Sequence, residues 1–173
     1  TLSNAQNSLG RIAIVLADTF NAQQKLGMDL NGDMGQDFFS QASPGVFSNS
    51  RNTGPTVLAS FSDTSQLTTS DYRVNVTGAG APGFTVTRLS DNTSVSPDSV
   101  TGAYDGVKLG FPTAPPALAP VAGDSFLIQP TRTGARDLAV VVTDPAKVAA
   151  ASPIITGNAS NNKGNGAISA GTV

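Results

Sequence analysis

The one long helical pattern in the chain lies near its N-terminus, where apolar residues recur every three or four positions. On a period of 3.6 residues, Leu9, Ile12, Ala13, Leu16 and Phe20 fall on one face, and the positions roughly opposite are polar. This spacing predicts an amphipathic helix over residues 5–26, with Leu9, Ile12, Leu16 and Phe20 as the main side chains of the packing face.

The ends of this helix carry their own signals. Ser3 or Asn4 can cap its start, and Gly27 suits a left-handed residue just beyond its end. Val15 and Leu26 widen the apolar arc beyond the main face, which suggests contact on two sides. Two interpretations stay open: the helix packs on its own domain, or it belongs to a bundle whose other helices lie outside this sequence.

The helix runs into a loop that is dense in Asp, Asn and Gly. Asp29, Asn31 and Asp33 alternate along this loop as calcium ligands do. An EF-hand loop, however, needs Gly at its sixth position and Glu at its twelfth, and this chain has Met34 and Ser40 there. We therefore expect no metal site in the loop.

The same loop is expected to be a turn held by its own side chains. Asn31 and Gly32 form a turn dipeptide, and neighbouring Asp side chains can accept hydrogen bonds from backbone amides. Phe38 and Phe39 then anchor the loop onto a core. These four residues are the predicted loop anchors, which redirect the chain from the helix into the β part.

Short stretches of alternating apolar and polar residues dominate the rest of the chain. Residues 41–55 are expected to form a loop with a short ordered patch at Gly45–Phe47, and Asp105-Gly106 is a strong hairpin signal. The expected strands are Thr56–Phe61, Tyr72–Thr77, Phe84–Leu89, Ser94–Val95, Val107–Phe111, Ser125–Gln129 and Leu138–Thr143.

Strands this short, with hairpin-type connections, are typical of an antiparallel β-sandwich or a small barrel-like domain. The predicted fold class is mainly β with an N-terminal α-helix (α+β). Residues 1–40 are expected to be a helix and turn loop of a helical shaft domain, residues 41–153 the β domain, and residues 154–173 a linker. The proline-rich residues 112–120 predict a stiff extended connection, and a short helix is expected after Asp144.

Composition narrows the chemistry that the chain can perform. Its 173 residues include no His, Cys or Trp, and the 12 acidic residues are all Asp. The absence of His and Cys excludes imidazole bases, thiol nucleophiles and zinc or iron–sulfur sites built from them. The formal net charge is −2 and the basic residues are scattered, so no nucleic-acid surface is expected. No apolar run approaches the ~18–20 residues that span a membrane.

Candidate catalytic groups are few. Asp29, Asp33 and Asp37 cluster in a polar loop, whereas a general acid needs an apolar cleft to raise its pKa. Ser125 follows Gly-Asp, as the nucleophile of some esterases does, but those enzymes need a later His. We therefore predict no catalytic, cofactor-binding or metal residues.

Four segments carry a resemblance to a known family. They read IAIVLADTFNAQQKLGMDLNGDMGQDFF, DYRVNVTGAGAPGFTVTRLSD, AGDSFLIQPTRTGARDLAVVVTDPAKVAAASP and GNASNNKGNGAIS. In order and spacing they resemble the middle of the bacterial flagellar hook-associated protein 1 family. The first segment is the most specific, since in this family such a helix runs into a Gly-x-Asp-Leu-Asn-Gly turn and a Phe pair.

The resemblance implies a structural, non-catalytic module at the hook–filament junction of the bacterial flagellum. It implies an extracellular location, reached by flagellar type III export without a cleaved signal peptide. The implied partners are copies of the protein itself, the hook protein and the adjoining hook–filament junction protein. We interpret the chain as an internal fragment without the terminal axial segments, and expect the fragment alone to be monomeric.

Two other classes of function stay open from composition alone. A β-rich binding module of an adhesin or phage-tail type shares the wealth of Thr, Asn and Gly. A hydrolase with paired Asp residues would need two carboxylates across a cleft.

Overall fold

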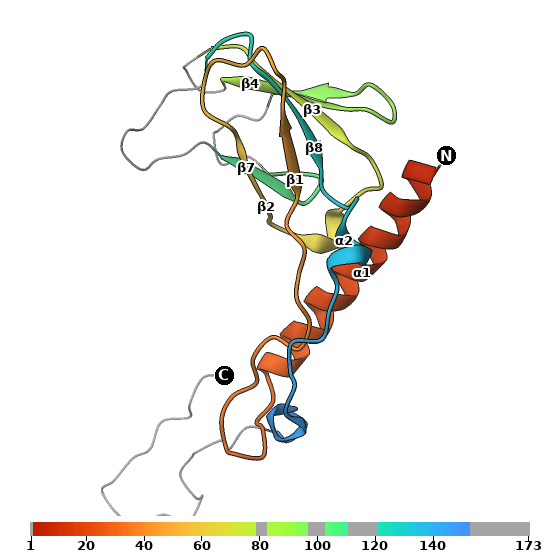
Figure 1. Cartoon of the computed structure of the whole chain (residues 1–173), viewed down its shortest axis with the longest axis vertical. Helices are drawn as coiled ribbons and strands as arrows, with labels where there is room; N and C mark the ends of the chain where they lie inside the picture. The colour runs from red at the N-terminus through yellow and green to blue at the C-terminus, as the bar shows by residue number, and fades with distance from the viewer. Residues whose placement is uncertain (1, 79–82, 97–102, 111–120, 153–173) are drawn as a thin grey trace, which may run out of the picture. The chain divides into compact units, whose positions relative to one another are not determined.

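The computed structural model describes residues 2–78, 83–96, 103–110 and 121–152 and contains two compact units (Figure 1). The first unit comprises Thr1–Asp18 with Gln41–Leu138, and the second comprises Thr19–Ser40 with Ala139–Val173. This division differs from the consecutive segments 1–40 and 41–153 expected from the sequence, because the first part of the helix groups with the strands. The expected linker 154–173 and the proline-rich connection 112–120 lie outside the described residues.

Helix α1 spans Leu2–Lys25, so it begins earlier than the amphipathic pattern predicts. Ser3 and Asn4 lie inside it and are not caps. Gly27 does not adopt the left-handed conformation expected of it; that conformation occurs in the loop at Gly32, with φ of 86°. Gly27 instead permits a close approach, because a Cβ there would lie 2.1 Å from the carbonyl oxygen of Ala149.

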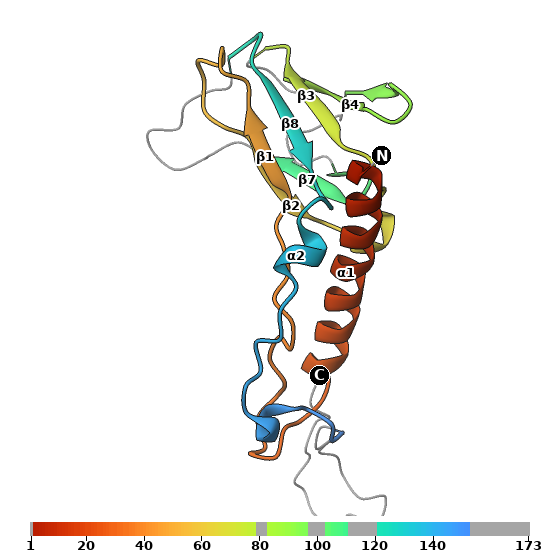
Figure 2. The same cartoon turned by 45° about the vertical axis from the view of Figure 1, so that its right-hand side comes forward.

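The larger sheet of the first unit has five antiparallel strands in the order β1-β8-β3-β4-β5 (Figure 2). Its strands are β1 (Gly45–Ser48), β8 (Ser125–Gln129), β3 (Tyr72–Val76), β4 (Phe84–Arg88) and β5 (Ser94–Val95). Val74 at the centre of β3 lies opposite Val86 on one side and Phe126 on the other. The alternation of apolar and polar residues along these strands therefore places one face of the sheet inward.

The smaller sheet has three antiparallel strands in the order β2-β7-β6. These are β2 (Leu58–Phe61), β7 (Val107–Gly110) and β6 (Ala103–Tyr104). Asp105 and Gly106 connect β6 to β7 with φ angles of 48° and 75°. Two successive positive φ angles identify a type I′ hairpin turn, which confirms the turn predicted from this dipeptide.

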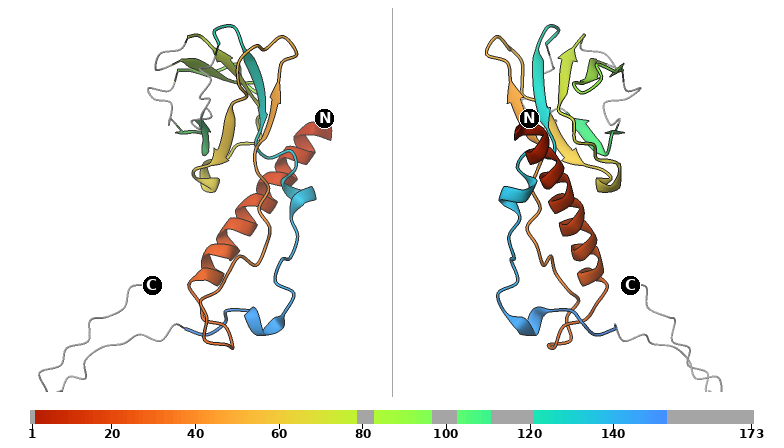
Figure 3. Two further views of the ribbon diagram at one scale, coloured as in Figure 1. Left: turned by 60° about the vertical axis from the view of Figure 1, so that its left-hand side comes forward. Right: turned by 90° about the vertical axis from the view of Figure 1, so that its right-hand side faces the viewer.

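The two sheets, whose strands are drawn in Figure 3, contribute side chains to one hydrophobic core. Its members come from both sheets, their connections and α1: Ile14, Val57, Leu67, Tyr72, Val74, Val76, Phe84, Val86, Val107, Leu109, Phe126 and Ile128. The predicted α+β class with antiparallel strands is confirmed, and the sheets are open rather than closed into a barrel.

Several expected elements differ from those observed. The run Leu138–Thr143 is not a strand; within it, Val140 forms an isolated bridge with Phe39. Residues 134–137 form the short helix α2 (Gly134–Asp137), and the helix expected after Asp144 is a 3₁₀ turn, Pro145–Lys147. A further 3₁₀ turn spans Thr64–Gln66, and the ordered patch expected at Gly45–Phe47 within the loop 41–55 is strand β1.

Candidate assembly surface of the helix

In the first unit, α1 packs through a face of small residues. A Cβ added at Gly10 would lie 1.7 Å from the carbonyl oxygen of Thr131, so only glycine allows this approach. Ile14 is buried, and its side chain packs against Gly134. A Cβ added at Gly134 would lie 2.8 Å from Cδ1 of Ile14. Ala13 and Ala17 are buried on the same side of the helix.

Polar side chains complete this buried face near the start of the helix. The amide of Asn7 donates to the Thr69 carbonyl at 2.9 Å and to Asp71 Oδ1 at 3.0 Å, and it accepts from Arg132 Nε at 2.7 Å. Arg132 also pairs with Asp71 at 2.6 Å, and Gln129 donates to the same carboxylate at 3.1 Å. Burial of a polar group costs free energy unless the group is hydrogen-bonded. These hydrogen bonds satisfy the polar groups and therefore allow α1 to pack stably through a polar face.

The predicted packing face is exposed in the first unit. Leu9, Ile12 and Leu16 are 59%, 65% and 50% exposed, and Leu2 continues the row at 76%. Of the two interpretations left open by the sequence, packing of this face on the helix's own domain therefore does not agree with the first unit. Periodicity identifies the apolar face of a helix, but it does not identify the partner that covers it.

This exposed row, which we call the apolar stripe (Leu2, Leu9, Ile12 and Leu16), is unusual for a surface. Full burial of an aliphatic side chain of this size contributes about 1.5–3 kcal/mol. Leu2, Leu9, Ile12 and Leu16 also recur with the spacing of a and d positions in a heptad, which is the pattern of helix-to-helix packing. The stripe is thus a candidate assembly surface.

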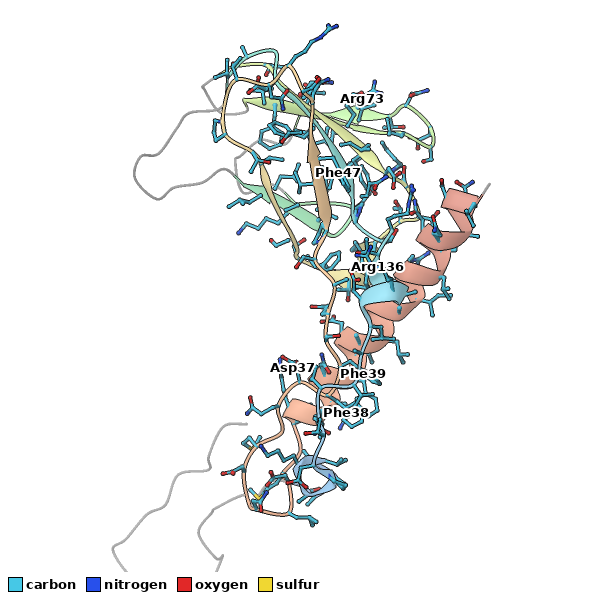
Figure 4. All side chains as sticks on the ribbon, viewed as in Figure 1. Asp37, Phe38, Phe39, Phe47, Arg73 and Arg136 are labelled. Atoms are coloured by element: carbon cyan, nitrogen blue, oxygen red, sulfur yellow. The ribbon has the colours of Figure 1, made fainter. Side chains whose placement is uncertain are left out.

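The second unit contains the remaining residue of the predicted face, Phe20, in a cluster of three aromatic rings, of which Phe38 and Phe39 are labelled in Figure 4. Its ring centroid lies 4.9 Å from that of Phe38 and 5.3 Å from that of Phe39, with tilted or edge-to-face geometry. Phe20 is still 41% exposed. Phe38 and Phe39 thus anchor the loop to Phe20 of the helix, and neither belongs to the buried core onto which they were expected to anchor it.

Two buried amides hold the rest of the second unit against the helix. Asn21 accepts from the backbone N–H groups of Phe38 and Phe39, both at 2.9 Å, and donates to the Phe39 carbonyl at 2.8 Å. Gln24 donates to the Lys147 carbonyl at 2.9 Å and accepts from the N–H of Ala149 at 3.2 Å. The buried side chains of α1 in this unit are therefore polar.

The loop after α1 folds around the carboxylate of Asp29. Its Oδ1 accepts from the N–H of Asn31 at 2.8 Å and of Asp33 at 2.9 Å, and Gly32 supplies the positive φ of the turn. The N–H of Asp33 is the main cause that lowers the pKa of Asp29. A lowered pKa is the opposite of what a general acid at neutral pH requires.

No three His, Cys, Asp or Glu side chains are arranged to hold a metal ion in the part of the chain that the structure describes. Asp29, Asp33 and Asp37 do line one hollow of about 660 Å³ in the second unit. The carboxylate of Asp37 pairs there with Lys25 at 2.7 Å. The sequence cluster is thus brought together in space, but Asp29 and Asp37 already have partners.

A second polar network lies between the sheets of the first unit. Tyr72 Oη donates to Asp105 Oδ2 at 2.8 Å and lies 2.6 Å from Thr68 Oγ1. Arg88 donates to both oxygens of Asp105 and lies over the ring of Tyr104, 5.4 Å from its centroid. Burial raises the pKa of Tyr72 well above its usual value, and the hydrogen bonds that Arg88 donates to Asp105 raise the pKa of Arg88. Both groups keep their protons, so the network locks the β6–β7 turn.

Comparison with known proteins assigns these features to a family. Residues 1–39 match the model of the flagellar hook-associated protein FlgK helical domain. Residues 47–130 match the D2-like domain of flagellar hook-associated protein 1. The chain belongs to the flagellar hook-associated protein 1 family.

Individual relatives agree with the family models. Flagellar hook-associated protein 1 of Escherichia coli (strain K12) is 36% identical over 94% of this chain and 29% of its own length. The protein of that name from Salmonella typhimurium is 34% identical over 94% of this chain and 30% of its own length. The chain therefore spans less than a third of the length of these relatives.

One solved structure is similar to this chain in both fold and sequence. It is the flagellar hook junction protein FlgK from Burkholderia pseudomallei, with a TM-score of 0.74 and 36% identity, covering 94% of this chain and 29% of that one. The match to the helical family model ends at residue 39, which is the second residue of the Phe38-Phe39 pair. Within the described residues, no helix has both the length and the apolar character needed to cross a membrane.

Sequence reasoning found Leu9, Ile12 and Leu16 of the apolar stripe and the aromatic residues, but it missed the amide side chains that are buried on the other face of the helix. Asn7, Asn21 and Gln24 read as ordinary surface positions of an amphipathic helix. One signal could have found them: they recur with Gly10, Ala13 and Ala17 on a single helical face of small and amide residues.

Proposed function

We propose that this chain is a structural, non-catalytic module of a hook–filament junction protein of the bacterial flagellum, located outside the cell. The observation that carries the proposal is the apolar stripe, which is exposed in this chain and lies within the part that matches a helical domain. A subunit that works by packing needs such a surface, whereas an enzyme needs a cleft with reactive groups. Membership of the hook-associated family and the likeness to a hook junction protein support the same function.

In this proposal, other helices of the parent protein cover the apolar stripe. The chain spans 29% of the length of one relative, so most of such a protein lies outside this sequence. Leu9, Ile12 and Leu16 then form a seam with those helices, and Phe20, itself a member of the aromatic cluster, extends the seam. Residues 1–40 belong to the helical shaft, residues 41–153 to an outward β domain, and residues 154–173 lead into the next segment.

The loop anchors have a mechanical role in this arrangement. The turn at Asn31 and Gly32 reverses the chain, and the Phe38-Phe39 pair fastens it to Phe20. Force transmitted along the helix would reach the returning chain through these contacts and through the buried amide of Asn21. The partners in this proposal are further copies of the protein, the hook protein and the adjoining junction protein.

The test uses two exposed leucines of the same chain. Leu9 on the apolar stripe is 59% exposed and Leu58 on β2 is 54% exposed, so Leu9→Glu and Leu58→Glu introduce the same charge at similar exposure. Each variant of the full-length parent is expressed in bacteria that lack the gene, and filaments and swimming are scored. We expect the unaltered parent and Leu58→Glu to restore filaments, and Leu9→Glu to fail.

A folding control separates assembly from misfolding. In the 173-residue chain, Leu9→Glu should keep its unfolding midpoint, because substitutions at exposed positions usually change stability by less than about 0.5 kcal/mol. Full restoration of filaments by Leu9→Glu would contradict the role of the stripe. Failure of the unaltered parent to restore them would contradict the proposed function itself.

A further inference from the structure

The turn that follows α1 contains an Asn-Gly pair, Asn31-Gly32, and both residues are exposed. Asparagine is one of the chemically labile residues of proteins. It is most reactive before glycine, because glycine has no Cβ to obstruct attack by its own backbone nitrogen. The space around Gly32 is also open, since a Cβ added there would meet nothing within 4 Å. The dipeptide that forms the turn is therefore also a place where the chain can react with itself.

This reaction needs water and no other partner. The backbone nitrogen of Gly32 attacks Cγ of Asn31, and the bond that forms closes a succinimide ring. The bond between Cγ and Nδ2 of Asn31 breaks, and Nδ2 leaves as ammonia with the proton of the Gly32 N–H. Water then opens the ring at either of its two carbonyl groups, which leaves aspartate or isoaspartate at position 31.

In the folded turn, Asp29 holds both of the groups that have to react. The N–H of Gly32 donates to the backbone carbonyl of Asp29 at 3.2 Å, and Nδ2 of Asn31 donates to Asp29 Oδ2 at 3.3 Å. Asp29 Oδ1 accepts from the backbone N–H of Asn31 at 2.8 Å. The attacking nitrogen and the leaving group are thus both engaged with Asp29, and the attack requires these hydrogen bonds to open.

The products of the reaction do not fit the closed turn. Met28 forms an isolated bridge with Met34, and inside it the N–H of Asp29 donates to the carbonyl of Asp33 at 2.8 Å. Isoaspartate at position 31 adds a carbon to the main chain between the two methionines. Both products also replace the Asn31 amide, a donor to Asp29, by a carboxylate that repels it. The modification therefore loosens the turn that reverses the chain.

We propose that Asn31 is a site of spontaneous modification, at which the nitrogen of Gly32 closes a succinimide with the Asn31 side chain and the hydrogen bonds to Asp29 set the rate. The site acts within a single chain and needs no neighbouring subunit. A chain that persists for longer gains a negative charge at position 31 and loses the contact between this residue and Asp29.

The test incubates the 173-residue chain in heavy-oxygen water at neutral pH and maps its tryptic peptides by mass spectrometry. Isoaspartate that carries the heavy oxygen should accumulate at position 31, more slowly in the folded chain than in the same chain unfolded in guanidinium. Asp29→Ala should raise the rate about tenfold, the effect of losing one hydrogen bond to a charged group. Asp33→Ala is the matched control, because it removes a carboxylate from the same loop but keeps the backbone N–H that Asp29 accepts, and it should leave the rate unchanged. The second Asn-Gly pair, Asn165-Gly166, lies in a different tryptic peptide, and its rate should be the same in all three proteins.

Hydrogen exchange separates a released turn from an unfolded unit. The amides of Phe38 and Phe39, which Asn21 holds, should stay protected in Asp29→Ala. With these amides protected, an unchanged or lower rate at position 31 would overturn the role of Asp29. If they lose protection, the unaltered chain decides, and equal rates in its folded and unfolded states would overturn that role. Aspartate without isoaspartate, or no conversion of Asn31 even in guanidinium, would overturn the modification site itself.

Discussion

Substitution of Gly10 by alanine tests how the helix packs on the β-sheets. An ideal Cβ at this position would lie 1.7 Å from the carbonyl oxygen of Thr131 and 2.9 Å from its carbonyl carbon. Both atoms belong to the backbone, so neither can move aside as the end of a flexible side chain would. The clash therefore has to separate the helix from residues 131–134 or distort both.

The expected magnitude is a balance of two effects. Alanine is a better helix former than glycine by about 1 kcal/mol, so an unpacked helix would gain stability from Gly10→Ala. Overpacking in a close contact costs typically about 1–3 kcal/mol, and a clash with backbone atoms belongs at or above the upper end of that range. The structure therefore predicts a net loss of about 2 kcal/mol in the free energy of unfolding.

Urea unfolding followed by circular dichroism measures this loss. A cost of about 2 kcal/mol lowers the urea midpoint by roughly 1 M for a typical dependence on denaturant. Gly78→Ala is the matched control, because a Cβ there would meet nothing within 4 Å. A Gly10→Ala protein that is as stable as the unaltered chain, or more stable, would refute the packing of α1 described above.

Three further predictions address other parts of the structure. Ile12→Ser should change the stability of this chain by less than about 0.5 kcal/mol, whereas Ile14→Ala should cost about 2–5 kcal/mol, because only Ile14 is buried; equal urea midpoints for the two would contradict this. Asn21→Ala should cost about 1–3 kcal/mol and accelerate hydrogen exchange at the amides of residues 38 and 39, which lose their acceptor; unchanged exchange would refute the clamp. Burial raises the pKa of Tyr72 in the folded chain above its ordinary value of 10.0. The phenol therefore ionises at lower pH in the unfolded chain than in the folded chain, and the free energy of unfolding should fall as the pH rises above 10. Tyr72→Phe should weaken that fall in urea titrations at pH 8 and pH 11, and an unchanged fall would show that Tyr72 is not its source.

The strands were predictable because the pattern that indicates each strand lies within its own residues. Tyr72–Val76 and Ser125–Gln129 alternate apolar and polar residues, and the observed strands begin where the pattern predicts. The Asp105-Gly106 turn follows from the need for two positive φ angles. The run Leu138–Thr143 is apolar enough for a strand, but a strand also needs a continuous neighbour, and only an isolated bridge forms there.

The buried face of the helix was not predictable, because it depends on contacts with residues far away in the sequence. Asn7 bonds to residue 69, and Gln24 bonds to residues 147 and 149, so their partners are defined only once the chain has folded. Leu9, Ile12 and Leu16 were found by periodicity, but periodicity does not identify what covers them. The same limit applied to Phe38 and Phe39, whose aromatic character predicted an anchor but not that Phe20 would be its partner.

The accessibility of a thiol at position 12 tests the central claim most directly. The chain contains no cysteine, so Ile12→Cys introduces a single reporter on the apolar stripe of this chain. In the 173-residue chain the thiol should react with a maleimide as fast as an unfolded peptide, because Ile12 is 65% exposed. In the full-length parent, the account predicts a reaction slower by about a hundredfold or more, since reaction would require local opening of the covering helices. Equal rates in the two proteins would contradict the claim that the stripe is a seam between helices.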